Sequence, residues 1–195
     1  MFGDLSGYAH AETGFGALHT YASATNLGGT LYSWASATAS FDDNLTVSGG
    51  TGTGYFLADF TVDGTRDASG DAFSTSGLYW SNLPGGVPGN LQSGVHTYEG
   101  TTPIQFTYGT PFAFHAEMIS NIIFAFGGFG TGLADFSNTA RLSAVHVLDA
   151  SGNPVTNFTL TSASGHQYLQ PVPEPATLAA LGLGIAAIMR RRTAP

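Results

Sequence analysis

Alternation of apolar with small or polar residues is the feature that most limits what this chain can fold into. It is clearest from Tyr55 to Val62, where Phe56, Ala58, Phe60 and Val62 occupy every second position. Side chains two residues apart share one face of a β-strand. Further segments of this kind recur at intervals of roughly 8–12 residues with no convincing helical period between them, which is typical of all-β domains.

The composition supports strands joined by many turns. Glycine is abundant (27 residues), whereas only 9% of residues are charged. Glycine, serine and threonine are weak helix formers. We expect turns at Gly49–Gly54, at Asp63-Gly64 and at Asp149–Pro154. The segments expected to form strands lie between Leu18 and Phe41, from Phe41 to Val47, and at Tyr55–Val62, Ala72–Trp80, Val95–Glu99, Ile104–Tyr108, Phe112–Phe126, Arg141–Leu148 and Val155–Thr161.

These patterns predict a β domain over residues 1–170, followed by a separate tail over residues 171–195. The expected architecture of the first part is an antiparallel β-sandwich, jelly-roll-like, because the strands are short and evenly spaced. The tail is expected to contain a short apolar helix.

The distribution of charge excludes several classes of function. Residues 1–171 hold two arginines and no lysine against twelve acidic residues, a net charge of −10. Such an acidic body repels phosphate backbones, so we expect no nucleic-acid partner.

The chain has no cysteine, which excludes disulfides, thiolate metal sites and cysteine nucleophiles.

The tail combines three features in a fixed order. Pro173, Glu174 and Pro175 form a stiff stretch that suits neither a helix nor a central strand. The uncharged run Ala176–Met189 follows, and three basic residues end it: Arg190, Arg191 and Arg192. Fourteen helical residues span about 21 Å, less than the ~30 Å hydrocarbon core of a membrane. We therefore expect a marginal, transient membrane segment whose basic end stays in the cytoplasm.

This tail resembles the bacterial PEP-CTERM sorting signal, in which Pro-Glu-Pro precedes an apolar helix and an arginine cluster. The resemblance implies export, an exosortase as partner, and passage through the inner membrane during sorting. It also implies a Gram-negative bacterium that makes exopolysaccharide and biofilm matrix, with the protein at the cell surface or outside the cell. Met1–Tyr21 contains neither a basic nor an apolar signal-peptide region, so we expect a leader upstream.

Two sets of residues in the body are candidates for ligand binding. Asp63, Asp67 and Asp71 recur every four residues in a glycine-containing stretch and could supply oxygen ligands to Ca²⁺. The alternative is that they are turn and solvated loop residues. Trp34, Tyr79 and Trp80 could stack on sugar rings, although aromatic side chains in β-sandwiches more often pack in the core.

Motifs that identify common enzyme classes do not occur. The histidines lack metal-ligand spacing, although His115 and Glu117 should share one strand face. The glycine runs Gly49–Gly54 and Gly127–Gly132 are not followed by a helical pattern, as a phosphate loop requires. We therefore expect a non-catalytic exported protein of the cell surface or matrix. One alternative is a lectin-like module that binds exopolysaccharide, with or without calcium. Another is a hydrolase acting on matrix polymers, for which Asp42-Asp43 or Glu99 and Glu117 could form a carboxylate pair.

Overall fold

The structure is a computed structural model that describes residues 5–28, 33–80, 91–125 and 127–168. These residues form ten antiparallel strands in two sheets, which confirms the predicted all-β class. The strands are β1 (Leu5–Gly14), β2 (Ala17–Asn26), β3 (Ser33–Ser48), β4 (Thr53–Gly70), β5 (Ala72–Trp80), β6 (Gly94–Tyr98), β7 (Ile104–Thr107), β8 (Phe112–Phe124), β9 (Gly130–Asp149) and β10 (Thr159–Ser162).

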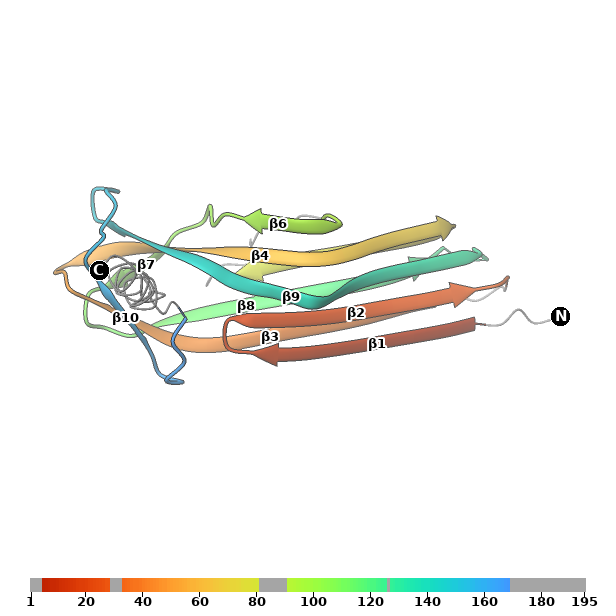
Figure 1. Cartoon of the computed structure of the whole chain (residues 1–195), viewed down its shortest axis with the longest axis horizontal. Helices are drawn as coiled ribbons and strands as arrows, with labels where there is room; N and C mark the ends of the chain where they lie inside the picture. Colours follow the sequence, from red (N-terminus) through yellow and green to blue (C-terminus); the bar gives the residue numbers. More distant parts are fainter. Residues whose placement is uncertain (1–4, 29–32, 81–90, 126, 169–195) are drawn as a thin grey trace, which may run out of the picture.

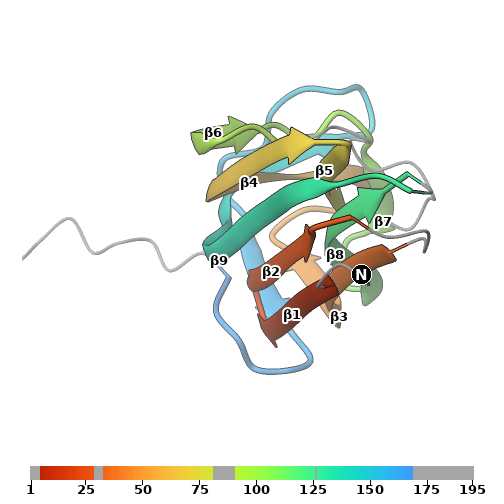
Figure 2. The same cartoon turned by 90° about the vertical axis from the view of Figure 1, so that its right-hand side faces the viewer.

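The first sheet has the order β1-β2-β9-β4-β6, with β7 also paired to β4, and the second has the order β10-β3-β8-β5. Apart from β1–β2 and β6–β7, every connection crosses from one sheet to the other. The molecule is elongated because β3, β4, β8 and β9 are long (Figure 1). Viewed from one end, the two sheets lie face to face (Figure 2). The finer expectation of a jelly-roll-like strand order stays a prediction, since two antiparallel sheets of six and four strands do not by themselves define it.

The core fills the space between the sheets and is rich in phenylalanine. The alternation in β4 is confirmed, because Phe56, Ala58, Phe60 and Val62 are all buried. Phe56 packs against Phe114 of the opposite sheet, with ring centroids 5.6 Å apart. Burial of such rings supplies most of the driving force that holds the two sheets together.

A small polar cluster also joins the sheets. The hydroxyls of Thr20 in β2 and Ser120 in β8 lie 2.8 Å apart, and Ser76 in β5 lies 3.1 Å from Ser120. All three residues are buried, and each hydroxyl has a partner. Mutual hydrogen bonding offsets the cost of taking these groups out of water.

The turn predicted at Asp63-Gly64 is wrong. Strand β4 continues through both residues to Gly70, and the pairing of β4 with β9 only shifts register between Asp63 and Thr65. Gly64 is required here because a β-carbon would lie 2.2 Å from Cδ1 of Phe136. The glycine therefore marks a close approach of backbone to a core ring rather than a turn. The turn lies at Gly70, whose φ is +64°.

Other boundaries follow the predictions to different extents. Strand β5 has the predicted bounds, and the expected break at Asp149–Pro154 is present. The backbone N–H of Asn153 donates to the Asp149 carboxylate, and with the other bonds of this turn it holds the pKa of Asp149 below its usual range. The strand predicted over Val155–Thr161 is reduced to β10, and strand β1 was not predicted. The helix expected at Ala176–Met189 lies outside the described residues.

Candidate ligand-binding face

The outward surface of the second sheet carries a row of apolar side chains at one end. Trp34 in β3 pairs with Ile123 in β8, and Ile123 pairs with Phe73 in β5. Residues paired in this way point to the same face, and this face is turned away from the core. We call Trp34, Ile123 and Phe73 the aromatic row.

Both rings of the aromatic row are open to solvent. Trp34 is 67% exposed and Phe73 is 62% exposed. Neighbouring strands lie about 4.8 Å apart, so the two aromatic residues are separated by about 10 Å across the sheet. Exposed aromatic residues that cluster on one face mark a contact surface more often than single exposed residues do.

Polar side chains form the next row along the same strands. Ser36 follows Trp34 on the face and its hydroxyl donates to Asn121 Oδ1 at 2.7 Å, while Thr75 lies opposite Asn121 on the other side. Further along, Ser40, Glu117 and Tyr79 occupy one row. The face thus alternates apolar surface with hydroxyl, amide and carboxylate groups.

The aromatic residues predicted from the sequence divide between this face and the core. Trp34 and Tyr79 lie on the face, but Trp80 points inward and is buried, with its ring centroid 5.1 Å from that of Phe60. Sequence reasoning missed Phe73, although the period of two in Ala72–Trp80 places it on the same side as Tyr79. Tyr79 is only half-buried, so it remains available at the edge of the face.

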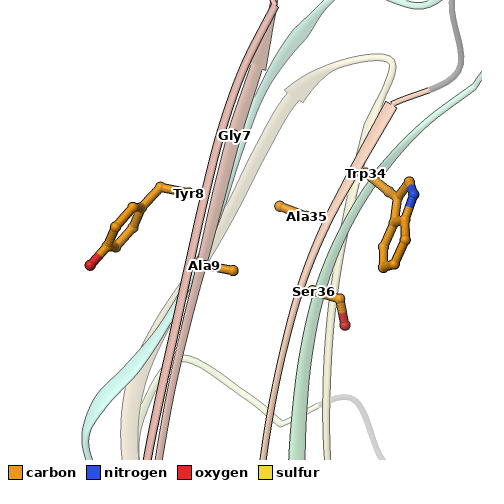
Figure 3. Close-up of a pocket in the computed structure, with 6 residues that line it drawn as sticks. All are labelled: Gly7, Tyr8, Ala9, Trp34, Ala35 and Ser36. Carbon is orange, nitrogen blue, oxygen red and sulfur yellow. The ribbon is translucent and has the colours of Figure 1, made fainter.

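Figure 3 shows the neighbouring edge of the sandwich, where β1 of the first sheet passes β3 of the second. Ala9 and Ala35 point toward one another between the strands, whereas Tyr8 and Trp34 point away from the gap in opposite directions (Figure 3). Two small cavities of about 290 and 250 Å³ open here. Trp34 is among the residues that line both cavities, although its ring points away from the gap (Figure 3).

The acidic residues considered for calcium do not share a loop. Asp63 and Asp67 lie within β4, and Asp71 follows it. Four residues of strand extend about 13 Å, which is too far for Asp63 and Asp67 to coordinate one ion directly. Among the described residues, no group of three or more histidine, aspartate or glutamate side chains could hold a metal ion.

Two histidine–aspartate pairs lie outside the core between the sheets, although Asp59 of the second pair is itself buried. His115 Nδ1 and Asp42 Oδ1 are 2.9 Å apart on the same face as the aromatic row, and Glu117 shares that face as predicted. On the other sheet, His146 Nε2 lies 2.8 Å from Asp59 Oδ2. The nearby Ser143 hydroxyl donates to the Asp59 carbonyl at 3.2 Å. The Ser143 hydroxyl is thus engaged by a backbone carbonyl.

A buried carboxylate fastens the last described residues to the body. Asp43 faces inward from β3 and accepts hydrogen bonds from the Ser164 N–H, the Ser164 hydroxyl and the Tyr168 hydroxyl. The Asn44 N–H donates to it as well, at 2.8 Å. Burial alone would raise the pKa of Asp43, but these hydrogen bonds outweigh burial and hold the pKa below its usual range. Burial and the contact with Asp43 raise the pKa of Tyr168, which stays a neutral donor.

The tail residues Pro173, Glu174, Pro175, Arg190, Arg191 and Arg192 lie outside the described part of the structure. Within the described residues, no helix is long and apolar enough to cross a membrane.

Comparison with known proteins bears on this tail. The family model of the PEP-CTERM protein-sorting motif matches residues 171–192. Searches of curated proteins and of solved structures found no match. The match covers the Pro-Glu-Pro stretch, the apolar run and the three arginines. The chain is therefore a PEP-CTERM sorting domain-containing protein, marked for export and for membrane-associated sorting by an exosortase.

Proposed function

We propose that the β domain is a non-catalytic surface or matrix module that binds a neutral polysaccharide through the outward face of its second sheet. The observation that carries the proposal is the aromatic row, in which Trp34 and Phe73 stand exposed on either side of Ile123. A sugar ring has an apolar C–H face and a rim of hydroxyls. Aromatic rings can stack on the apolar face, and hydrogen-bonding side chains can bind the hydroxyls.

The rows of polar side chains on this face can supply the hydrogen bonds to sugar hydroxyls. Ser36, Asn121 and Thr75 lie directly beside the aromatic row, and Ser40 and Glu117 lie further along the same strands. A flat face of this type suits an extended chain better than a small molecule, because a small ligand is usually enclosed in a cleft.

Net charge favours a neutral polymer. The body carries −10 and would repel an acidic polysaccharide over the range of the Debye length. Glu117 and Asp42 add negative charge to the face itself. Export by the sorting tail would bring the domain to the exopolysaccharide and biofilm matrix of a Gram-negative bacterium, which is the setting we propose for it.

Affinity electrophoresis of the purified full chain, in native gels with and without a neutral polysaccharide, tests the proposal. We expect the polysaccharide to retard the chain. Stacking of a nucleic-acid base on an aromatic side chain contributes about 1–3 kcal/mol, as judged by alanine substitution. If a sugar ring stacks with a similar free energy, Trp34→Ala and Phe73→Ala should each weaken binding by about fivefold to 150-fold.

Tyr8→Ala is the matched control, because Tyr8 is similarly exposed (60%) but lies on the opposite side of the molecule (Figure 3). It should leave the retardation unchanged. A further arm of the experiment compares binding in calcium with binding in EDTA. We expect binding to persist in EDTA, because Asp63 and Asp67 lie along β4 of the other sheet and Asp71 lies just beyond it. Absence of retardation by every polysaccharide tried, with or without calcium, contradicts carbohydrate binding. Turnover of a polysaccharide contradicts the non-catalytic part.

A further inference from the structure

Strand β1 is a long open edge of the first sheet (Figure 1). It has ten residues, all of them exposed, and among the described strands it pairs only with β2. Other edges are shorter or covered: β6 has five residues and β10 has four, and at β5 the Ser76 carbonyl accepts a hydrogen bond from the Leu91 N–H at 2.8 Å. An open strand of this length is a template for pairing with another strand.

Strand β1 lacks the features that usually protect such an edge. It contains no lysine, arginine or proline, and its pairing with β2 runs along its whole length without a register shift. The second sheet also has an open edge, because β10 covers only Leu45–Ser48 of β3. That edge carries the acidic pair Asp42 and Asp43, which opposes pairing with a like strand. Strand β1 is therefore the edge better suited to an added strand.

The turn after β1 shows which of its backbone groups face the open edge. Phe15 and Gly16 form a two-residue turn, so the flanking residues Gly14 and Ala17 are a hydrogen-bonded pair. Hydrogen-bonded pairs alternate with non-hydrogen-bonded pairs along an antiparallel ladder. The N–H and C=O groups that point away from β2 therefore belong to every second residue of β1, namely Leu5, Gly7, Ala9, Ala11 and Thr13.

The inner side of β1 is also uncovered. Leu5, Gly7 and Ala9 are among the residues that line the two cavities between β1 and β3, and Leu5 is 50% exposed. Ala9 points into this gap toward Ala35 (Figure 3). Another strand beside β1 would continue the inner face of the first sheet and close this side of the sandwich.

The charges on β1 indicate what the added strand is. His10 and Glu12 lie on its outer side, with Nε2 and Oε1 3.6 Å apart. A second copy of β1, antiparallel about a two-fold axis at Ala11, sets His10 of each copy opposite Glu12 of the other copy. These are non-hydrogen-bonded pairs, in which side chains are closest. Axes at Ala9 or His10 lack this complementarity, although all three axes join inner face to inner face.

We propose that the chain forms a two-fold dimer in which β1 pairs with β1 of a second copy, antiparallel and centred on Ala11. Residues 8–14 of the two strands oppose each other, and the two first sheets join into one. The axis is perpendicular to the joined sheet, so the outward faces of both second sheets point the same way. One polymer can then contact two aromatic rows at once; this consequence alone rests on the proposed polysaccharide binding.

Disulfide formation between single cysteines tests the register of this pairing. The chain has no cysteine, so Ala11→Cys gives one thiol in each full chain. At the axis the two Cα atoms lie about 5.5 Å apart, within the range that a disulfide spans. Ala9→Cys is the matched control, because Ala9 is an exposed alanine on the same side of β1 whose two copies would lie about 14 Å apart. On a non-reducing gel after mild oxidation, we expect a covalent dimer from Ala11→Cys and at most a trace from Ala9→Cys.

Sedimentation equilibrium of the full chain measures the association itself, in about 0.15 M salt to screen the repulsion between the acidic bodies. Ala11→Pro removes the N–H at the axis and should raise the dissociation constant at least about tenfold. The monomer should still fold, because that N–H points away from β2 and proline is tolerated at sheet edges.

Charge variants test the pairing of His10 with Glu12. His10→Glu and Glu12→Lys each set like charges opposite one another in the dimer, so each variant alone should associate more weakly than the native chain. An equal mixture of the two should restore the dimer, because every carboxylate then lies opposite a lysine or a histidine. Asp149→Lys makes the same charge reversal as Glu12→Lys at a distant exposed turn, and it should leave the dimer intact.

Circular dichroism of each variant shows whether the sandwich remains folded, and the charge variants serve if Ala11→Pro does not fold. A native chain that stays monomeric up to about 1 mM overturns the proposal. So does cross-linking at position 9 instead of position 11. Association that is unchanged in every folded β1 variant also overturns it, because the contact would then lie on another surface. None of these results decides polysaccharide binding, which is measured separately through Trp34→Ala and Phe73→Ala.

Discussion

Gly64→Ala is expected to destabilise the domain because a methyl group has no room at this position. Its β-carbon would lie 2.2 Å from Cδ1 of Phe136. Carbon atoms in contact normally lie about 3.5–4.0 Å apart, so the ring or the strand would have to move by about 1.3 Å or more. Phe136 is fully buried, and therefore its ring cannot turn into solvent.

The size of the effect follows from two opposing contributions. Overpacking a close-packed core costs about 1–3 kcal/mol. Replacing glycine by alanine also restricts the unfolded chain, which stabilises the fold by about 0.4–1 kcal/mol. The net destabilisation should be about 1–2 kcal/mol. In a domain of this size that corresponds to a decrease in Tm of about 2–8 °C.

Thermal unfolding followed by circular dichroism measures this change on the full chain. Gly14→Ala is the control, because nothing lies within 4 Å of a β-carbon built there, and its Tm should be unchanged or slightly raised. A double-mutant cycle with Phe136→Leu separates steric overlap from a backbone effect. The smaller side chain should recover about 1 kcal/mol of the loss in the cycle. Strict additivity of the two substitutions, or a Gly64→Ala protein that melts at or above Gly14→Ala, refutes the packing described for β4.

Two further predictions concern buried polar groups. The pKa of Asp43 is lowered in the folded state, so its stabilising contribution is complete above the unfolded pKa of about 3.9 and is lost as pH falls through the folded value. We expect the Tm advantage of the native chain over Asp43→Asn to be constant above about pH 5 and to shrink below about pH 4; an advantage independent of pH contradicts this. Ser120→Ala leaves the hydroxyls of Thr20 and Ser76 buried without their shared partner and should cost about 1–3 kcal/mol in denaturant unfolding. A loss below about 0.5 kcal/mol would show that water replaces the missing hydroxyl.

The strands that could be predicted from the sequence are those with one face in the core. Tyr55–Val62 is an example, because its inward residues Phe56, Ala58, Phe60 and Val62 are all apolar and buried. Strand β1 gave no such signal, since every residue from Leu5 to Gly14 is exposed at the edge of the sheet. Its formation depends on pairing with β2 rather than on burial.

Local patterns also misled where tertiary contacts decide the outcome. Asp63-Gly64 has the composition of a hairpin turn, but the ring of Phe136 explains the glycine, and it comes from the neighbouring strand β9, which is far away in the sequence. Strands β4 and β9 are also longer than predicted. Both continue through register shifts, which the alternation of apolar and polar residues does not reveal.

The candidate site combines residues that only strand register brings together. Trp34 was identified from its residue type, but its neighbour Phe73 is 39 positions away and joins it through Ile123. The hydrogen-bonded cluster of Asp43, Ser164 and Tyr168 is less predictable still, because Asp43 and Tyr168 are separated by 125 positions. In the sequence Asp43 is one of many acids, and only the fold shows that its side chain faces inward.

Acrylamide quenching of tryptophan fluorescence tests the central claim most directly. The chain has two tryptophans, of which Trp34 is exposed and Trp80 is buried, so the quenchable emission belongs to Trp34. If a neutral polysaccharide stacks on the aromatic row, saturation with it should remove most of this quenching, and the protection should be absent in Trp34→Phe. Retardation by the polysaccharide with Trp34 still fully quenchable would contradict the account, because the polymer would then bind elsewhere.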